Sequence, residues 1–209
     1  NLANGFRDIG HHVTFLVLNK GEKFDKNIFR SRLRNDIPIL KWEDHAENFN
    51  NMIKEFGFDI INSHNVAIEY NLYRKNIEIN IPYVVSLHGG YETVPDLLTS
   101  DFMLYLSRNV KAWLYLAEKN ILPLVNNGLK NANFFKVFNA IPLRKDINDV
   151  DFNIRSYLKL SNESILLVLA SRAIHEKGWE IAIESIRRLS YSTSRDFHLL
   201  LIGDGENIN

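Results

Sequence analysis

The chain has 209 residues, 45% of them hydrophobic and 24% charged, a composition typical of soluble globular domains with a sizeable core. Lys plus Arg and Asp plus Glu number 25 each, so no excess of positive charge favours nucleic acid as a partner. The absence of cysteine excludes disulfides and thiolate metal sites, and no apolar run reaches the roughly 20 residues of a membrane helix. We expect a cytoplasmic protein.

The chain opens with apolar residues at helical spacing, and the run "HVTFLVL" at residues 12–18 predicts a strand after Gly10. Residues 19–44 are polar and give no clear pattern. Residues 49–56 then place Phe, Met, Ile and Phe on one helical face, with Gly57 as the expected helix end. Because the chain begins inside a helix and ends after a strand and its turn, we expect a fragment of a longer protein.

Further along the chain, short apolar runs alternate with helical patterns. We expect strands at residues 58–62, 83–87, 134–138, 165–170 and 198–202, and helices at residues 66–77, 97–119 and from Gly178 onward. The strands are continuous apolar runs, which indicates a parallel α/β sheet with both faces covered by helices. The polar segment at residues 139–152 is typical of a linker. We therefore predict two doubly wound domains, residues 1–150 and an incomplete second domain at residues 151–209.

Ligands of open parallel sheets bind beyond the carboxyl ends of the strands. The residues that follow the expected strands are His64; His88, Gly89 and Gly90; Asn139 and Ala140; Ser171, Arg172 and Lys177; and Gly203, Asp204, Gly205 and Glu206. These residues are the candidates for a functional site.

Arg172 and Lys177 lie in the short turn between a strand and a helix. The N–H groups at a helix start favour an anion, a guanidinium binds two phosphate oxygens at once, and an ammonium adds a point charge. Gly178 leaves room for close approach. One diphosphate would satisfy all these groups; the alternative is a solvated loop in which Glu176 partly neutralises both cations.

Five stretches carry a resemblance to a known family. "SRAIHEKGWEIAIESIRRL" resembles the second-domain signature of GT-B fold glycosyltransferases, specifically the large retaining family 4. "NLANGFRDIGHHVTFL", "IPYVVSLHGG", "KVFNAIPL" and "HLLLIGDGE" resemble other parts of that family in the same order, although Ala140 stands where the family usually has glycine. The resemblance implies two Rossmann-like domains of the GT-B type.

The resemblance also implies roles for the candidate residues. Arg172 and Lys177 would stabilise the diphosphate of a UDP- or GDP-linked sugar, and His88 would face the donor sugar at the domain cleft and help to position it. The other residues implied to bind the nucleotide are Ser171, Gly178, Gly203, Asp204 and Gly205, and the other cleft-lining residues are His64, Gly89, Gly90 and Asn139. The implied reaction is front-face transfer with retention to a saccharide or lipid-linked acceptor, as in polysaccharide biosynthesis, without an essential metal ion.

For several of these residues a purely structural role stays open as the alternative. His88 could bond to a loop carbonyl, His64 could be structural, and "GDGE" could be a plain tight turn. The D-x-D pair Asp149 and Asp151 lies in the linker and is interpreted as a solvated acidic segment. "GDGENI" lacks the third glycine of a dinucleotide fingerprint, and no histidine pair has zinc-site spacing.

Other functions also stay open. The acidic E-x7-E segment that the family carries further along is absent here, so this chain could be inactive or a non-catalytic binding subunit. A sugar-nucleotide epimerase or a phosphorylase would have the same fold. Contact with the inner face of a membrane through Arg30, Arg32 and Arg34 is a further alternative, and a solvated loop explains these arginines equally well.

Overall fold

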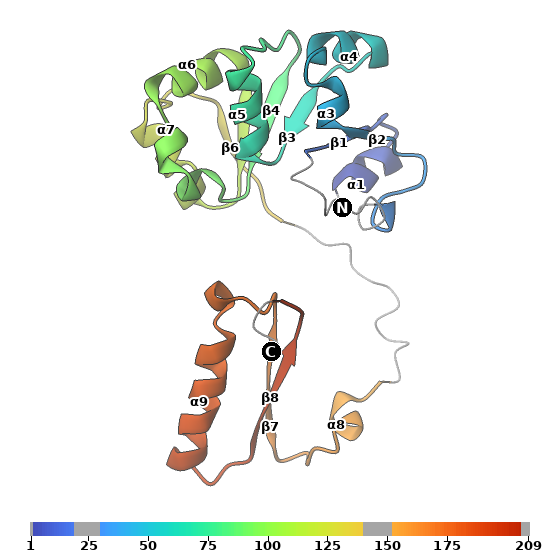
Figure 1. Ribbon diagram of the computed structural model, residues 1–209. Helices are drawn as coiled ribbons and strands as arrows, with labels where there is room; N and C mark the ends of the chain where they lie inside the picture. The colour runs from blue at the N-terminus through green and yellow to red at the C-terminus, as the bar shows by residue number, and fades with distance from the viewer. Residues whose placement is uncertain (1, 19–29, 140–151, 206–209) are drawn as a thin grey trace. The chain divides into compact units, whose positions relative to one another are not determined.

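The computed structural model describes residues 2–18, 30–139 and 152–205. The chain forms two compact units, Asn1–Ile141 and Pro142–Asn209, and each is described by itself (Figure 1). The strand pairs in the described residues are all parallel, which confirms the predicted α/β class. Apart from its two end residues, the linker predicted at residues 139–152 lies outside the described part of the chain.

The first unit alternates strands and helices. Its helices are α1 Leu2–Asp8, α3 Trp42–His45, α4 Phe49–Phe56, α5 Val66–Arg74, α6 Ser100–Asn109 and α7 Leu122–Asn126. Its strands are β1 Phe15–Val17, β2 Ile39–Lys41, β3 Ile61–Ser63, β4 Tyr83–Leu87, β5 Ala112–Tyr115 and β6 Phe134–Lys136. Short 3-10 turns form η1 Tyr91–Thr93, η2 Pro95–Leu97 and η3 Glu118–Asn120. The region that gave no sequence pattern contains β2 and α3.

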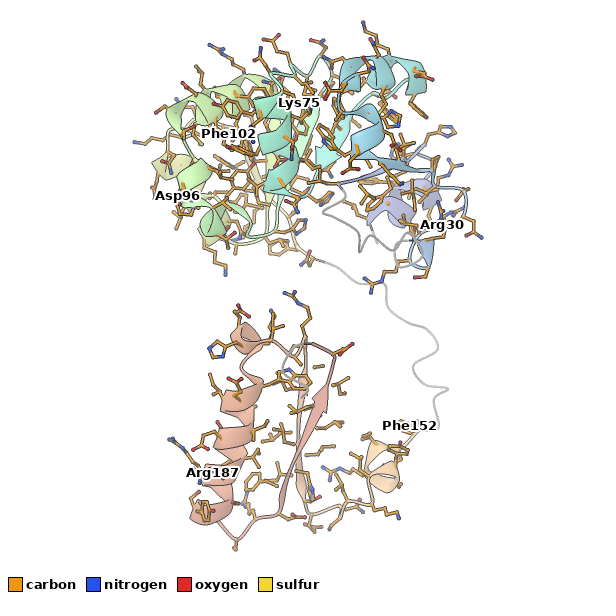
Figure 2. All side chains as sticks on the ribbon, viewed as in Figure 1. Arg30, Lys75, Asp96, Phe102, Phe152 and Arg187 are labelled. Atoms are coloured by element: carbon orange, nitrogen blue, oxygen red, sulfur yellow. The ribbon has the colours of Figure 1, made fainter. Side chains whose placement is uncertain are left out.

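The core of this unit lies around a four-stranded sheet in the order β3-β4-β5-β6. Figure 1 shows α5 in front of β3 and β4, while β1 and β2 form a separate parallel pair. Phe102 of α6, labelled in Figure 2, is fully buried, with its ring centroid 5.5 Å from that of Tyr70 and 5.2 Å from that of Tyr73 on α5. These ring contacts fix α5 and α6 against each other.

The single helix predicted at residues 97–119 is wrong. Helix α6 ends at Asn109, Val110 adopts extended backbone, and β5 begins two residues later. The N–H of Lys111 donates to the carbonyl of Tyr83 at 2.8 Å, and the N–H of Trp113 donates to the carbonyl of Asn133 at 2.9 Å. Trp113 is 1% exposed, so pairing in the sheet and burial of the indole outweigh the helical pattern.

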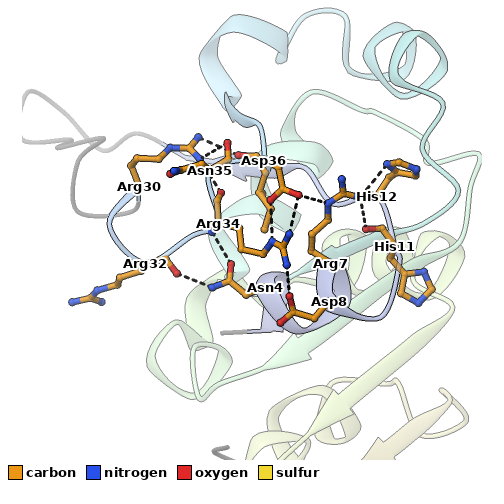
Figure 3. A network of polar contacts seen from close by, with 11 residues as sticks. Asn4, Arg7, Asp8, His11, His12, Arg30, Arg32, Arg34, Asn35 and Asp36 are labelled. Carbon is orange, nitrogen blue, oxygen red and sulfur yellow. Dashed lines mark hydrogen bonds and ion pairs between the residues drawn. The ribbon is translucent and has the colours of Figure 1, made fainter.

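A charged network fixes α1 to the loop that precedes β2 (Figure 3). Asp36 accepts from Arg7 at 2.8 Å and from Arg34 at 3.0 Å, and Arg34 also pairs with Asp8. The hydrogen bonds from Arg34, then those from Arg7, lower the pKa of Asp36 to about 2. Arg30 donates to backbone carbonyls of the same loop. Two of the three arginines considered for membrane contact therefore bind within the chain.

The second unit contains α8 Ile154–Tyr157, β7 Ile165–Ala170, η5 His175–Lys177, α9 Trp179–Ser192 and β8 Phe197–Ile202. Strands β7 and β8 pair in parallel along their full lengths, and α9 packs against β8. The prediction that both faces of these strands are covered is wrong for the described residues, since Leu167 is 40% and Val168 56% exposed. Two strands and one long helix offer too few side chains to cover both faces.

Candidate functional site

Two of the predicted site residues, His64 and His88, lie side by side in the first unit. His64 directly follows β3 and His88 directly follows β4, and these strands are parallel neighbours. The Nδ1 atom of His64 lies 2.9 Å from the Nε2 atom of His88, and the rings stack with centroids 5.2 Å apart. The carboxyl ends of adjacent strands therefore bring together two residues that are 24 positions apart in the sequence.

The histidine pair lines a cavity of about 230 Å³, formed by residues 64–66 and 85–91. Gly89 and Gly90, which the sequence analysis also singled out, are part of its wall. Val66 at the start of α5 faces Gly90 across the cavity wall, because a Cβ at Gly90 would lie 3.5 Å from its side chain. Asn139 is exposed after β6 and does not contribute to this cavity.

The two histidines can share one proton across their contact. In a 2.9 Å contact between ring nitrogens, one must donate and the other accept, so two charged rings would place N–H groups face to face. Burial, and then the neighbouring ring of His88, lower the pKa of His64. The lowered pKa of His64 favours its neutral form, and the pair can donate or accept hydrogen bonds in the cavity.

Glu69, a residue that the sequence analysis missed, lies behind the cavity. Its carboxylate is fully buried and accepts hydrogen bonds from Ser63, from the Tyr83 hydroxyl at 2.9 Å and from the Tyr91 hydroxyl at 3.2 Å. Burial raises the pKa of Glu69 to about 7, and the hydroxyl donors partly oppose that rise. Burial and then the charge of Glu69 raise the pKa values of Tyr83 and Tyr91 well above their usual range.

In the second unit, the strand ends bring the predicted donor loop against the glycine turn. The N–H of Ser171 donates to the carbonyl of Ile202 at 3.0 Å, and the N–H of Ala173 donates to the carbonyl of Asp204 at 2.9 Å. The indole of Trp179 donates to the hydroxyl of Ser171 at 2.8 Å. These bonds fix the backbone on both sides of Arg172.

Gly203 and Gly205 permit this close approach of the two loops. A Cβ at Gly203 would lie 1.8 Å from the carbonyl oxygen of Ser171, and a Cβ at Gly205 would lie 2.4 Å from that of Ala173. Both glycines also have positive φ angles, of 153° and 157°. The glycine turn therefore holds the loop that carries Arg172 and cannot accept a side chain at either position.

Arg172 and Lys177 are both exposed, and their side chains form no ion pair among the residues that the structure describes. The nearby carboxylate of Glu180 pairs with His175, at 3.0 Å. Gly178 follows Lys177 and precedes the 14-residue helix α9, so Lys177 lies just before the helix start, whereas Arg172 lies shortly after the end of β7. Ala140, Asp149, Asp151 and Glu206 lie outside the described residues.

The model of the Glycosyltransferase Family 4 domain matches residues 1–127. This chain belongs to glycosyltransferase family 4. The match spans more than half of the chain and includes His64, Glu69 and His88, whereas Arg172 and Lys177 lie beyond it. A comparison with curated proteins found no match.

Membership of family 4 confirms that the chain carries a glycosyltransferase domain with parallel α/β sheets. Within residues 2–18, 30–139 and 152–205, no three His, Asp or Glu side chains are grouped to hold a metal ion. The helices of that same part include none that is both long and apolar enough to cross a membrane.

Proposed function

We propose that the protein transfers a sugar from a nucleotide-diphosphate sugar to a saccharide or lipid-linked acceptor, with retention of the anomeric configuration. Membership of family 4 supports sugar transfer in general. The donor class rests on one observation in the second unit, which is a pair of exposed cations on a loop fixed by the glycine turn, with no ion pair to any described residue. The proposal includes a GT-B arrangement and a cytoplasmic protein, with or without contact at the inner membrane face.

Arg172 and Lys177 would act on the leaving group. As the bond between the sugar and the phosphate breaks, negative charge grows on the diphosphate, and a fixed guanidinium and ammonium stabilise that charge. Because Ser171 and Ala173 are anchored to β8 and its turn, the backbone at Arg172 needs little rearrangement when the anion arrives. The leaving phosphate would accept the proton of the acceptor hydroxyl, which is consistent with front-face transfer and retention.

His88 would contact the donor sugar. A neutral imidazole can donate one hydrogen bond to a sugar hydroxyl or accept one from it. His88 lies in the cavity wall beside two glycines, where a ligand can approach the backbone closely. Ser171, Gly178 and the turn of Gly203, Asp204 and Gly205 would line the nucleotide side, and His64, Gly89, Gly90 and Asn139 the sugar side.

The experiment that tests the donor site is ligand-observed NMR with UDP, GDP and their sugar conjugates on the full chain. We expect the double variant Arg172→Ala, Lys177→Ala to lose at least tenfold in affinity, because each charged hydrogen bond contributes about 1.5–3 kcal/mol. The matched control is Arg187→Ala, Arg188→Ala, which removes the same charge from α9, where both arginines pair with Glu184. Equal losses in the two double variants would contradict a site at Arg172.

The reaction type is tested by product analysis. The anomeric proton signals of the product distinguish retention from inversion, and the products themselves distinguish transfer from epimerisation or phosphorolysis. Donor binding without any turnover would indicate a binding subunit.

Metal removal gives a separate test. The resemblance to GT-B enzymes implies no essential metal ion, so we expect transfer to continue after dialysis against EDTA. A loss of activity that Mg²⁺ or Mn²⁺ restores would contradict this expectation and reopen the role of Asp149 and Asp151.

A further inference from the structure

Glu69 joins the two loops that carry the histidine pair. Its two carboxylate oxygens accept from hydroxyls on three different elements, which are the end of β3, the start of β4 and η1. Ser63 directly precedes His64, and Tyr91 follows His88 by three residues and lines the same cavity. A single buried carboxylate is therefore hydrogen-bonded to side chains of the segments next to both histidines.

Glu69 is the acceptor that the three hydroxyls share, although the Tyr83 hydroxyl also donates to the Ser63 oxygen at 3.2 Å. Ser63, Tyr83 and Tyr91 are all buried, with exposures of 6%, 0% and 3%. A buried hydroxyl that loses its acceptor costs the desolvation of that group, so Glu69 stabilises the observed positions of these side chains. The ring of Tyr91 also packs edge-on against Trp113, which ties this arrangement to the core of the sheet.

His64 itself lies between two anchored residues. Ser63 is bound to Glu69, and the side chain of Asn65 accepts a hydrogen bond from the N–H of Ala67 at 2.9 Å, capping α5. Glu69 is in the first turn of the same helix. The backbone on both sides of His64 is thus anchored to α5, and His64 itself contacts His88.

We propose that Glu69 is a positioning residue: by accepting hydrogen bonds from Ser63, Tyr83 and Tyr91, it holds the His64 and His88 loops so that the two rings stay in contact and each keeps one tautomer. The functional meaning of this arrangement rests on the proposed role of His88 in sugar transfer. The arrangement itself can be tested without any turnover.

The other ionisable groups near the pair are few in the described structure. Glu92 on η1 faces Gly89, but it accepts a hydrogen bond from Asn120 at 2.9 Å. Tyr105 on α6 donates to the carbonyl of Ile77 and forms no hydrogen bond to Glu69. Glu69 is therefore the carboxylate that the hydroxyls beside the histidines contact directly.

The test is an NMR measurement of the histidine ring nitrogens in the full chain, with His64 and His88 assigned from single His→Asn variants. In the unaltered protein we expect one tautomer for each ring, because one nitrogen donates and the other accepts. Ser63→Ala and Tyr91→Phe each remove one hydroxyl that Glu69 binds. We expect averaged tautomers in both variants, and a rise in the titration midpoint of His64 as its contact with His88 loosens.

Tyr105→Phe is the matched control, because it also deletes one tyrosine hydroxyl bonded within this unit but leaves the ties of Glu69 in place. Fixed tautomers in Ser63→Ala, Tyr91→Phe and the control alike would overturn the proposal. Averaging in the control as well would overturn it too, since any lost hydroxyl would then have the same effect. Glu69→Gln keeps one acceptor oxygen. Its histidine tautomers should be averaged more than in the unaltered protein and less than in Ser63→Ala and Tyr91→Phe.

Kinetics separate this proposal from the proposed function. If the unaltered protein transfers sugar, we expect Ser63→Ala and Tyr91→Phe to lower kcat by about tenfold with little change in donor KM, because misplacement of a reacting group affects the transition state more than binding. Averaged tautomers in Ser63→Ala and Tyr91→Phe, together with no transfer by the unaltered protein, would reject the glycosyltransferase activity and leave the positioning role intact. Transfer by the unaltered protein, with tautomers that neither variant changes, would support the glycosyltransferase activity and reject the positioning role.

Discussion

A histidine whose ring stacks on that of a second histidine should resist protonation, as His64 does against His88. Burial is the larger cause of the lowered pKa of His64 and the ring of His88 is the smaller one. We therefore expect His64 to titrate below the ordinary value of 6.5 and His88→Asn to raise its midpoint only part of the way back. NMR titration of the His64 ring proton measures both effects, and a midpoint at or above 6.5 in the unaltered protein would contradict the packing of the pair.

The buried carboxyl of Glu69 should make folding stability depend on pH. Its pKa rises from 4.5 in an unfolded chain to about 7 in the fold, so the fold binds its proton more tightly. The protonated carboxyl therefore adds about 3 kcal/mol to the free energy of unfolding. That contribution is fully present below pH 4.5 and is lost as the pH rises through 7.

Glu69→Gln cannot titrate, so the unaltered protein should lose stability relative to this variant as the pH rises between these values. Urea unfolding of both proteins at several pH values measures the difference. A difference that does not change with pH would show that the carboxyl titrates normally in the fold.

The sequence contained a signal for Glu69 that a search for strand-end residues could not use. Glu69 and Leu72 are three residues apart on α5, so they share one helical face, and both are 0% exposed. The buried state of Leu72 could have been predicted, but a glutamate on a helix is normally solvated. Its burial depends on hydroxyls from Ser63, Tyr83 and Tyr91, and their approach is set by the pairing of β3 with β4. By contrast, the sequence could single out His64, His88, Gly89 and Gly90 because they come at the ends of two predicted strands.

At the scale of elements, the glycine turn after β8 can be tested by adding one methyl group. In Gly203→Ala the new Cβ would overlap the carbonyl oxygen of Ser171. The hydroxyl of the same serine accepts a hydrogen bond from the indole of Trp179. We expect a loss of about 3 kcal/mol or more in the stability of the second unit, and a shifted indole N–H signal of Trp179.

Gly178→Ala is the control, because its φ is 72° but its Cβ would meet only the side chain of Ile181, at 3.9 Å. There we expect the cost of a left-handed alanine alone, about 1 kcal/mol. Equal losses of stability in the two variants, measured by chemical denaturation, would mean that backbone strain and not the close approach sets the requirement for glycine.

Strands that turn-forming residues separate from their neighbours were predicted better than a strand that follows a helix after only two residues. The strands β4 and β7 have the predicted bounds, and Gly57 ends α4 as expected. Strand β5 was missed because only Val110 and Lys111 separate it from α6, and neither residue is a turn former. The residues of β5 become a strand through their pairing with β4 and β6, which is information that a local pattern does not contain.

At the scale of the whole molecule, the two units differ in how much apolar surface they bury. The described residues of the second unit include only Ala173 and Trp179 among the buried apolar side chains, whereas the first unit has a continuous core around β3 to β6. We expect the amide protons of β7 to exchange faster than those of β4 in a hydrogen-exchange experiment on the full chain. Slower exchange in β7 would indicate that contacts beyond the described residues stabilise this sheet.

The strand order of the first unit has a consequence for how the chain is made. Strands β3, β4, β5 and β6 lie beside one another in the order of their synthesis, and each is joined to the next through a short helical connection. Every new strand that leaves the ribosome therefore finds its partner already present, and no earlier strand must wait for a distant later one. Such local pairing favours rapid folding, so this sheet can grow from one edge while translation continues.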